Sequence, residues 1–189
     1  MLRFALTGPH GVGKTTLIKV LADRLLPLGR VTVCREAPRL IADQVGDLMF
    51  FRRENNTLSR QALIFLEHLM EEQRAAFGAD VVVSDRTLVD HLAYTEVLFP
   101  DFVNTPEART YRRLAFESLA RYGVIFQLPI EFPPVDDGVR EADITFQRQI
   151  GDTITALYAK AKVEPIIISG TVAERVAQVE HHLASLPPT

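Results

Sequence analysis

Short apolar runs alternate along the chain with longer segments in which apolar residues recur every three or four positions. The first run, LRFALTG, ends at Gly8, and the segment after it repeats apolar residues at Leu17, Leu21 and Leu25. A short apolar run bounded by turn residues is typical of a buried strand, and the wider spacing is typical of an amphipathic helix. The pattern therefore predicts strands at 2–8, 31–34, 79–85, 124–128 and 164–170.

Helical patterns fill the intervals between these strands. They cover residues 13–26, 57–77, 87–99, 105–122, 141–161 and 172–183, whereas residues 38–56 predict a short helix and then a loop. Strands that alternate with helices are typical of βαβ units, which build a parallel sheet covered on both faces through right-handed crossovers. We expect an α/β three-layer sandwich with a five-stranded parallel sheet. Since no repeat or linker interrupts the pattern, residues 1–189 are expected to form a single domain.

Composition does not change the expected fold, but it excludes some classes of function and some kinds of site. The net charge of −3 disfavours a general nucleic-acid binder, which usually shows a basic excess, although a local basic cleft stays open. The single cysteine, Cys34, excludes an internal disulfide and a multi-cysteine zinc site, and its place in VTVC favours a buried thiol. No apolar run approaches the ~18 residues of a membrane span and no signal-peptide pattern is present, so a cytoplasmic protein without a membrane partner is expected.

The stretch GPHGVGKTT directly after the first strand is the most specific chemical signal. It fits the pattern G-x-x-x-x-G-K-[ST] with Gly8, Gly13, Lys14 and Thr15, in the required place between a strand and a helix. Glycines let consecutive backbone N–H groups surround a phosphate chain, and the next helix points its positive end at it. Lys14 would reach the β and γ phosphates and Thr15 would ligate Mg²⁺. The expected nucleotide site comprises Gly8, Pro9, His10, Gly11, Val12, Gly13, Lys14, Thr15 and Thr16.

Other readings of this stretch exist. The whole segment could be a glycine-rich turn with a threonine at a helix start. Thr16 could pack or hydrogen-bond to its helix, so only a secondary nucleotide role is assigned to it. His10 is expected to be a variable position within the loop.

Ligands of open parallel sheets bind beyond the carboxyl ends of the strands, which makes the residues there candidates for chemistry. Asp85 ends the third strand, where it would hold Mg²⁺ together with Thr15 or organise the acceptor; alternatively it caps the following helix. Glu36 follows the second strand and is a candidate catalytic base, with a salt bridge to Arg35 or Arg39 as the alternative. Residues 169–172, at the end of the fifth strand, are candidates to border a purine base.

Arginines at these strand ends are candidates to bind the transferred phosphate or the acceptor. Arg39 and Arg86 could clamp substrate oxygens, and the alternative for each is a solvated surface arginine. A lid is expected around 131–149, carrying Arg140 to the transferring phosphate; alternatively Arg140 belongs to an ordinary loop, paired with Glu141 or Asp143. His68 and His91 are too far apart in sequence to predict a metal pair.

Three segments resemble the P-loop nucleoside and nucleotide kinases: GPHGVGKTT, REAPR and VVVSDRTLVDHLAY. They are most similar to the small AAA-type family that contains the ribosylnicotinamide kinase domain of bacterial NAD regulators. This resemblance implies the strand order 2-3-1-4-5, ATP with Mg²⁺, and an acceptor over strands two and three. Thymidylate kinases are similar too, but Ala37 interrupts their Arg-Glu-Pro element, and Leu69 stands near the position of their base-reading arginine.

Together these features predict an ATP-dependent phosphotransferase that acts on a small nucleoside- or nucleotide-like acceptor. Lys14, Glu36, Asp85, Arg86 and Arg140 would be catalytic, Thr15 and Asp85 would bind the metal, and Arg39, Asp85 and Arg86 would bind substrate. The main alternative is a regulatory switch that hydrolyses ATP or GTP without a small-molecule acceptor, although no Asn-Lys-x-Asp guanine motif is present. A nucleic-acid 5′-kinase is disfavoured by the acidic charge, and a homodimer stays open.

Overall fold

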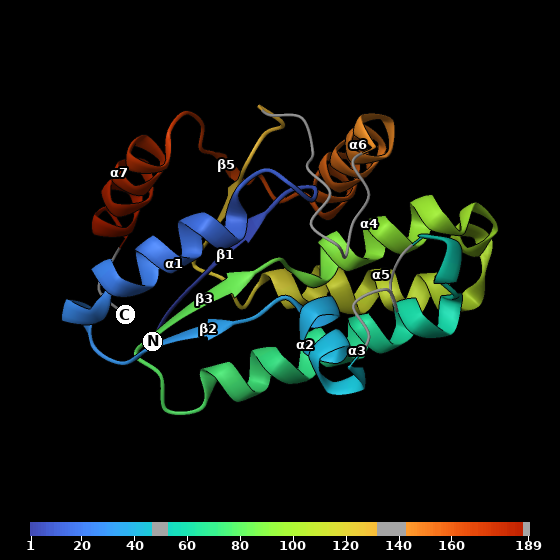
Figure 1. Cartoon of the computed structure of the whole chain (residues 1–189), viewed down its shortest axis with the longest axis horizontal. Helices are drawn as coiled ribbons and strands as arrows, with labels where there is room; N and C mark the ends of the chain where they lie inside the picture. Colours follow the sequence, from blue (N-terminus) through green and yellow to red (C-terminus); the bar gives the residue numbers. More distant parts are fainter. Residues whose placement is uncertain (47–52, 132–142, 187–189) are drawn as a thin grey trace.

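A computed structural model describes residues 1–46, 53–131 and 143–186 of the chain, and its elements follow the predicted alternation closely (Figure 1). The strands are β1 Leu2–Thr7, β2 Val31–Cys34, β3 Val81–Asp85, β4 Val124–Gln127 and β5 Ile166–Ile167. The helices are α1 Lys14–Arg24, α2 Ala37–Val45, α3 Leu58–Ala76, α4 Leu88–Leu98, α5 Pro106–Leu119, α6 Ile144–Ala161 and α7 Val172–Ala184. Short 3₁₀ turns are η1 Leu26–Leu28, η3 Arg53–Asn55 and η4 Pro100–Asn104.

The strands form one parallel sheet in the order β2-β3-β1-β4-β5, which confirms the predicted topology. β1 is the central strand and pairs with β3 so that Leu6 lies opposite Asp85, and with β4 so that Thr7 lies opposite Gln127. The ends of β1 and β3 therefore coincide, and the residues that follow β1 lie directly beside Asp85. This register joins the glycine-rich stretch to the carboxylate that the sequence singled out.

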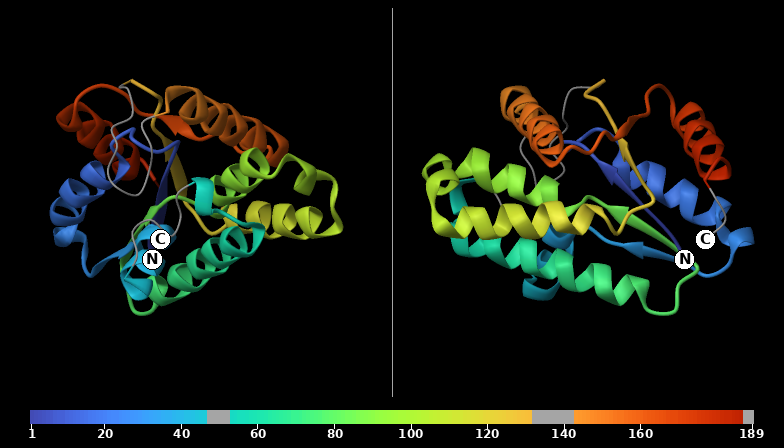
Figure 2. Two further views of the ribbon diagram at one scale, coloured as in Figure 1. Left: turned by 45° about the vertical axis from the view of Figure 1, so that its right-hand side comes forward. Right: turned by 180° about the vertical axis from the view of Figure 1, so that it is seen from behind.

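Helices cover both faces of the sheet, as the sequence predicts. Alternate residues of β1 point to opposite faces: Phe4 and Leu6 enter a core with α1 and α7, whereas Ala5 enters a core with α4, α5 and α6. Figure 2 shows α1 and α7 on one side of the strands and α3, α4 and α5 on the other. Both cores are made of fully buried aliphatic and aromatic side chains, so the sheet presents its strand ends on a rigid base.

Two details differ from the expected elements. β5 is only two residues long instead of seven, and Pro165, which has no backbone N–H to donate to a sheet, directly precedes it. The three 3₁₀ turns have no apolar periodicity of their own, and the sequence pattern gave no sign of them. Within the described residues, no helix combines the length and apolar character that crossing a bilayer requires.

Candidate nucleotide-binding site

The glycine-rich stretch forms a loop between β1 and α1 whose backbone only glycine adopts readily. Gly8, Gly11 and Gly13 have φ angles of 136°, 76° and 91°, in the left-handed region. A Cβ on Gly8 would also meet the Leu128 carbonyl oxygen at 2.7 Å, so that position excludes every side chain. Directly after Gly13, α1 begins, and its first backbone N–H groups have no acceptor within the helix. The loop thus has the conformation of an anion-binding concavity, as the spacing predicts.

Lys14 is folded back into this loop. Its Nζ donates hydrogen bonds to the carbonyls of Gly8 at 2.8 Å and Pro9 at 2.6 Å, and the residue is only 5% exposed. Burial, reinforced by the nearby Arg86 guanidinium, lowers the pKa of Lys14 to about 7. A cation that is costly to keep charged at this place is one that phosphate oxygens would stabilise strongly.

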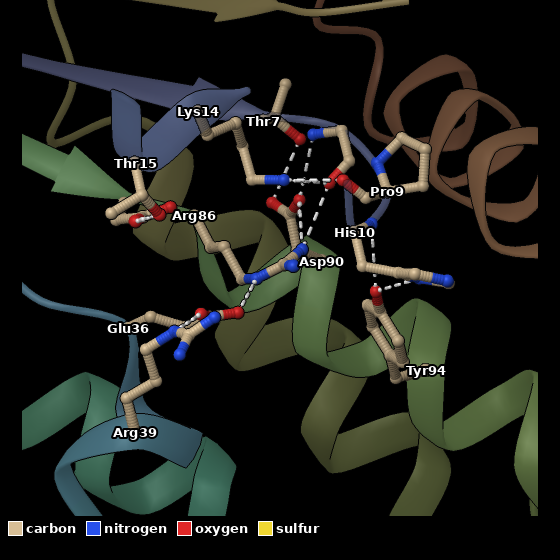
Figure 3. Close-up of polar contacts among 12 residues, drawn as sticks. Thr7, Pro9, His10, Lys14, Thr15, Glu36, Arg39, Arg86, Asp90 and Tyr94 are labelled. Carbon is tan, nitrogen blue, oxygen red and sulfur yellow. Dashed lines mark hydrogen bonds and ion pairs between the residues drawn. The ribbon is translucent and has the colours of Figure 1, made fainter. Parts of the chain in front are cut away.

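Thr15, in the first turn of α1 (Figure 3), contacts Asp85 at the end of β3. Thr15 Oγ1 donates to Asp85 Oδ2 at 2.8 Å. Asp85 Oδ1 is buried and has no hydrogen-bond partner within the described part of the chain. Burial, together with the Glu36 carboxylate, raises the pKa of Asp85. An orphaned carboxylate oxygen beside a hydroxyl is a donor set that suits Mg²⁺, which prefers hard oxygen ligands.

Asp85 does not cap the next helix, so that alternative is wrong. Thr87 is the N-cap of α4, and it forms a capping box with Asp90. Arg86 lies between Asp85 and Thr87 and has a φ angle of 88°, which is rare for a residue with a side chain. Its N–H donates to the Leu6 carbonyl at 3.0 Å. This strained turn directs the Arg86 side chain inward rather than into solvent.

Arg86 is buried at the centre of a charged cluster, so its alternative as a solvated surface arginine is wrong. It is 1% exposed, and its Nε donates to Glu36 Oε1 at 2.7 Å. Its Nη1 donates to the Gly8 carbonyl at 3.0 Å and lies 3.6 Å from Asp90 Oδ1. The other oxygen of Glu36 accepts from Arg39 Nε at 3.3 Å, which is one of the two salt bridges weighed as alternatives. The cluster therefore connects the start of the loop to α2 and α4.

A cavity of about 550 Å³ opens beside this cluster, between α1 and α2 at the edge of β2. Thr15, Glu36 and Asp85 contribute to its lining. Aliphatic and charged side chains form the remaining walls: Ile18, Lys19, Ala22, Asp23, Val33, Arg35, Arg39, Leu40 and Asp43. Cavities of this size commonly hold small molecules, and a ligand in this one would lie next to Glu36, Asp85 and the start of α1.

Asp90 is an important residue of this site that the sequence reasoning did not single out. Its fully buried carboxylate accepts hydrogen bonds from Thr7 Oγ1 at 2.9 Å, from the Gly8 N–H at 3.0 Å, and from the Thr87 N–H at 2.9 Å. It thereby ties the first glycine of the loop to the start of α4. The available signal was the motif T-x-x-D that opens a helix, because a capping box places an acid at that spacing.

The far side of the loop is held by α7. Arg175 donates to the Val12 carbonyl at 2.7 Å and pairs with Glu131, whose carboxylate also accepts from the Gly170 N–H at 3.0 Å. The segment 169–172 thus lies close to the loop, as its place after β5 predicts. Arg175 itself was missed, since nothing in its helical surroundings marks it. Thr16 is exposed on the first turn of α1 and does not pack there.

Several sequence candidates fall differently in space. Arg140 and the central part of the expected lid lie outside the described residues, and residues 144–149 begin α6. His10 is 3% exposed, and its ring lies against Tyr94 and Phe146. His68 and His91 do come together, with ring centroids 4.7 Å apart, because α3 and α4 pack side by side. No group of three metal-ligating side chains occurs among the residues described.

Solved structures place this fold among P-loop kinases. A thymidylate kinase from Ehrlichia chaffeensis matches with a TM-score of 0.68 and 19% identity, over 96% of this chain and 98% of its own. A deoxyadenosine kinase from M. mycoides matches with a TM-score of 0.68 and 12% identity, over 98% of this chain and 100% of its own. NadR, solved with NAD and AMP-PNP, matches with a TM-score of 0.68 and 13% identity, over all of this chain but 51% of its own.

These identities are low enough that the likeness shows the fold alone, and this chain spans about half the length of NadR. No curated protein matches the sequence. One family model, described as an AAA domain, does match, over residues 3–175. That range covers most of the chain and includes the loop, Glu36, Asp85 and Arg175. The chain therefore belongs to the AAA_28 family of AAA domains and has the fold of the P-loop kinases.

Proposed function

We propose that this protein is an ATP-dependent phosphotransferase that moves the γ-phosphate of ATP to a small nucleoside- or nucleotide-like acceptor. The observation that carries the proposal is the 2.8 Å hydrogen bond from Thr15 to Asp85, which connects the glycine-rich loop to a carboxylate whose other oxygen has no partner among the described residues. The cavity beside that bond gives an acceptor direct access to it. We propose further that residues 1–189 act as one cytoplasmic domain.

The loop and α1 would hold the triphosphate. Backbone N–H groups of the loop and the first turn of α1 would bind its oxygens, and the Lys14 ammonium would turn from the Gly8 and Pro9 carbonyls to the β and γ phosphates. Thr15 and Asp85 would hold Mg²⁺, which neutralises charge that develops on the phosphates. A secondary contact from Thr16 completes this part of the proposal.

Glu36 and the arginines would act on the acceptor side. Glu36 lines the cavity and would take the proton of an attacking hydroxyl. Arg86 fixes that carboxylate from one side and Arg39 from the other, so its orientation is determined before the acceptor arrives. Arg39 would also contact the acceptor, and Arg140, on a lid around 131–149, would stabilise the charge of the transferred phosphate.

The proposed class of acceptor rests on the similarity between this fold and the folds of solved kinases. The solved relatives are a thymidylate kinase, a deoxyadenosine kinase with dCMP and dCDP as products, and NadR, which is also solved with NR. The names of these proteins or the compounds bound to them thus point to nucleosides, nucleotides or related compounds. A nucleoside-like acceptor for this chain follows by analogy, and the cavity of about 550 Å³ has room for one.

The test is transfer of labelled γ-phosphate from ATP to a panel of nucleosides, mononucleotides and pyridine ribosides, with Mg²⁺. We expect at least one acceptor to be phosphorylated, and Lys14→Ala and Asp85→Asn to lose at least a hundredfold in turnover, with exposed Lys160→Ala unchanged. Phosphate release that no acceptor stimulates would reject the transferase and favour the regulatory ATP- or GTP-hydrolysing switch. Equal activity in Lys14→Ala would reject the whole site.

A further inference from the structure

His10, the third residue of the loop, is held by its backbone from two sides. Its N–H donates to the Tyr94 hydroxyl of α4 at 3.1 Å, and its carbonyl accepts from Gln147 Nε2 of α6 at 2.7 Å. The His10 ring reinforces the first contact, with Nδ1 2.9 Å from the same hydroxyl (Figure 3). Two helices that are distant in sequence therefore grip one peptide segment of the loop.

The position of this grip matters because of its neighbours. Gly8 and Gly11 flank the His10 segment and both have left-handed φ angles, so neither restrains the chain by a side chain of its own. Pro9 offers no backbone N–H with which to hold the loop. Besides the Lys14 ammonium, which donates to the Pro9 carbonyl, hydrogen bonds from other elements fix the middle of the loop. Those to His10 lie between the anchors that Asp90 and Arg175 supply at either end.

The position of Gln147 lowers the stability of the folded protein. The residue is fully buried, and its Oε1 has no hydrogen-bond partner within the described residues. A buried polar atom without a partner is destabilising, and an aliphatic side chain of similar size would avoid that penalty. Among the residues that the structure describes, the amide makes one hydrogen bond in return, to the His10 carbonyl. Since the buried oxygen lowers stability and the amide N–H holds the loop, the role of Gln147 is explained better by the shape of the loop than by the stability of α6.

Tyr94 connects the same grip to the charged cluster. Its ring lies 5.2 Å from the Arg86 guanidinium carbon, and Arg86 in turn binds Glu36 and the Gly8 carbonyl. Phe146, next to Gln147 on α6, packs its ring against both His10 and Tyr94. The Gln147 amide thus donates to the loop, whereas Tyr94 contacts both the loop and Arg86.

We propose that Gln147 and Tyr94 are positioning residues that set the shape of the phosphate loop by gripping the His10 backbone from α6 and α4. The proposal rests on the proposed function only in that the loop binds a triphosphate; it does not depend on any acceptor. Loss of either grip should loosen the middle of the loop and weaken nucleotide binding. Since both act on one peptide segment, their effects should be coupled rather than additive.

Three variants of Gln147 and Tyr94 separate positioning from stability. Gln147→Leu and Tyr94→Phe remove one grip each while keeping most of the volume. Gln147→Glu keeps the length, but an ionised carboxylate cannot donate to the His10 carbonyl, whereas a protonated one can. The matched control is Gln149→Glu, which makes the same change of charge on the exposed face of the same helix.

The first measurement is calorimetric titration with AMP-PNP and Mg²⁺ from pH 5.5 to 8.5. For Gln147→Leu and Tyr94→Phe we expect the Kd to rise about tenfold, the loss of roughly one hydrogen bond. For Gln147→Glu we expect a similar loss at pH 8.5 that recovers toward wild type as the pH falls. Titratable and charged groups around this backbone include His10, Lys14, Arg86, Asp90 and the Tyr94 hydroxyl, so each Kd is compared with wild type and Gln149→Glu at the same pH.

The second measurement needs no nucleotide. Amide hydrogen exchange of the peptide that contains His10 should be faster in Gln147→Leu than in wild type, with exchange in β1 and α1 unchanged. Kd values within twofold of wild type and unchanged exchange would overturn the proposal. So would a Kd loss in Gln147→Glu that does not recover with pH and that parallels a general loss of thermal stability. If wild type binds AMP-PNP but phosphorylates nothing, the transferase fails and this proposal stands.

Discussion

Lys14 shows most directly how one residue's surroundings prepare it for phosphate. Its ammonium donates to two loop carbonyls at 2.6 and 2.8 Å, yet burial still lowers its pKa from 10.5 to about 7. Carbonyl dipoles therefore do not fully replace the water that the ammonium loses on folding. A triphosphate supplies full negative charges at the same place, and its binding should raise that pKa again.

This environment predicts a pH dependence of stability. Between about pH 7 and 10.5 the unfolded chain keeps the Lys14 proton that the folded chain has lost, so the free energy of unfolding should rise with pH across that range. Lys14→Met, which cannot titrate, should lack this contribution. The check is urea denaturation of both proteins at several pH values from 7 to 10. The difference in unfolding free energy, wild type minus variant, should increase with pH, and a constant difference would contradict the buried ammonium.

Individual residues also show what sequence could and could not supply. The positions of Lys14, Thr15 and Asp85 followed from a motif and from a strand end, because those are local features of the chain. The partners of Arg86 did not follow, since Glu36 lies 50 positions away and its contact depends on the neighbouring placement of β2 and β3. The inward direction of the Arg86 side chain depends on a φ angle of 88°, which cannot be predicted from the residue type.

At the scale of elements, α4 does more than cover the sheet. Its first turn carries Asp90, which accepts bonds from Thr7, from the Gly8 N–H and from Thr87, and its next turn carries Tyr94. One helix thus fixes both the first and the third residue of the loop. The apolar pattern predicted that this helix exists and where it lies along the chain, but not that its amino-terminal end anchors the loop.

Replacement of Asp90 should therefore cost more than an ordinary helix cap. Asp90→Ala removes one carboxylate beside Arg86 and the acceptor of four buried donor groups on Thr7, Gly8 and Thr87, so we expect a loss of about 3 kcal/mol in unfolding free energy. The matched control is Glu174→Ala, which removes the acid of the exposed capping box of α7 and should cost clearly less. Chemical denaturation of the two variants and wild type measures the difference. Equal losses in both would mean that Asp90 serves only as a cap.

On the scale of the whole molecule, the site is assembled from nearly every layer. The loop lies between β1 and α1, Glu36 follows β2, Asp85 ends β3, and the outer anchors come from α6 and α7. The alternation of strands and helices predicted the layers, and the strand order came from the resemblance to P-loop kinases. The anchors from the last two helices could not be predicted, because contacts between residues more than 130 positions apart leave no local pattern.

An assembled site of this kind predicts stabilisation by its ligand. Mg²⁺ with AMP-PNP at a hundred times its Kd should add about 2.7 kcal/mol to the free energy of unfolding, through mass action alone. The measured quantity is the melting temperature with and without ligand. It should rise in wild type and in the exposed control Gln149→Glu, and it should not rise in Asp85→Asn when Mg²⁺ carries the nucleotide. A rise of equal size in Asp85→Asn would argue against its metal role.

The most direct test of the central claim is calorimetric titration of the folded protein with AMP-PNP, in the presence and absence of Mg²⁺. The geometry of the loop, Lys14, Thr15 and Asp85 predicts one nucleotide per chain, tighter binding with Mg²⁺ than without it, and a large loss of affinity in Lys14→Ala. If protein that is demonstrably folded gives no heat of binding with AMP-PNP or its guanine counterpart, the loop does not bind a triphosphate and the account is wrong.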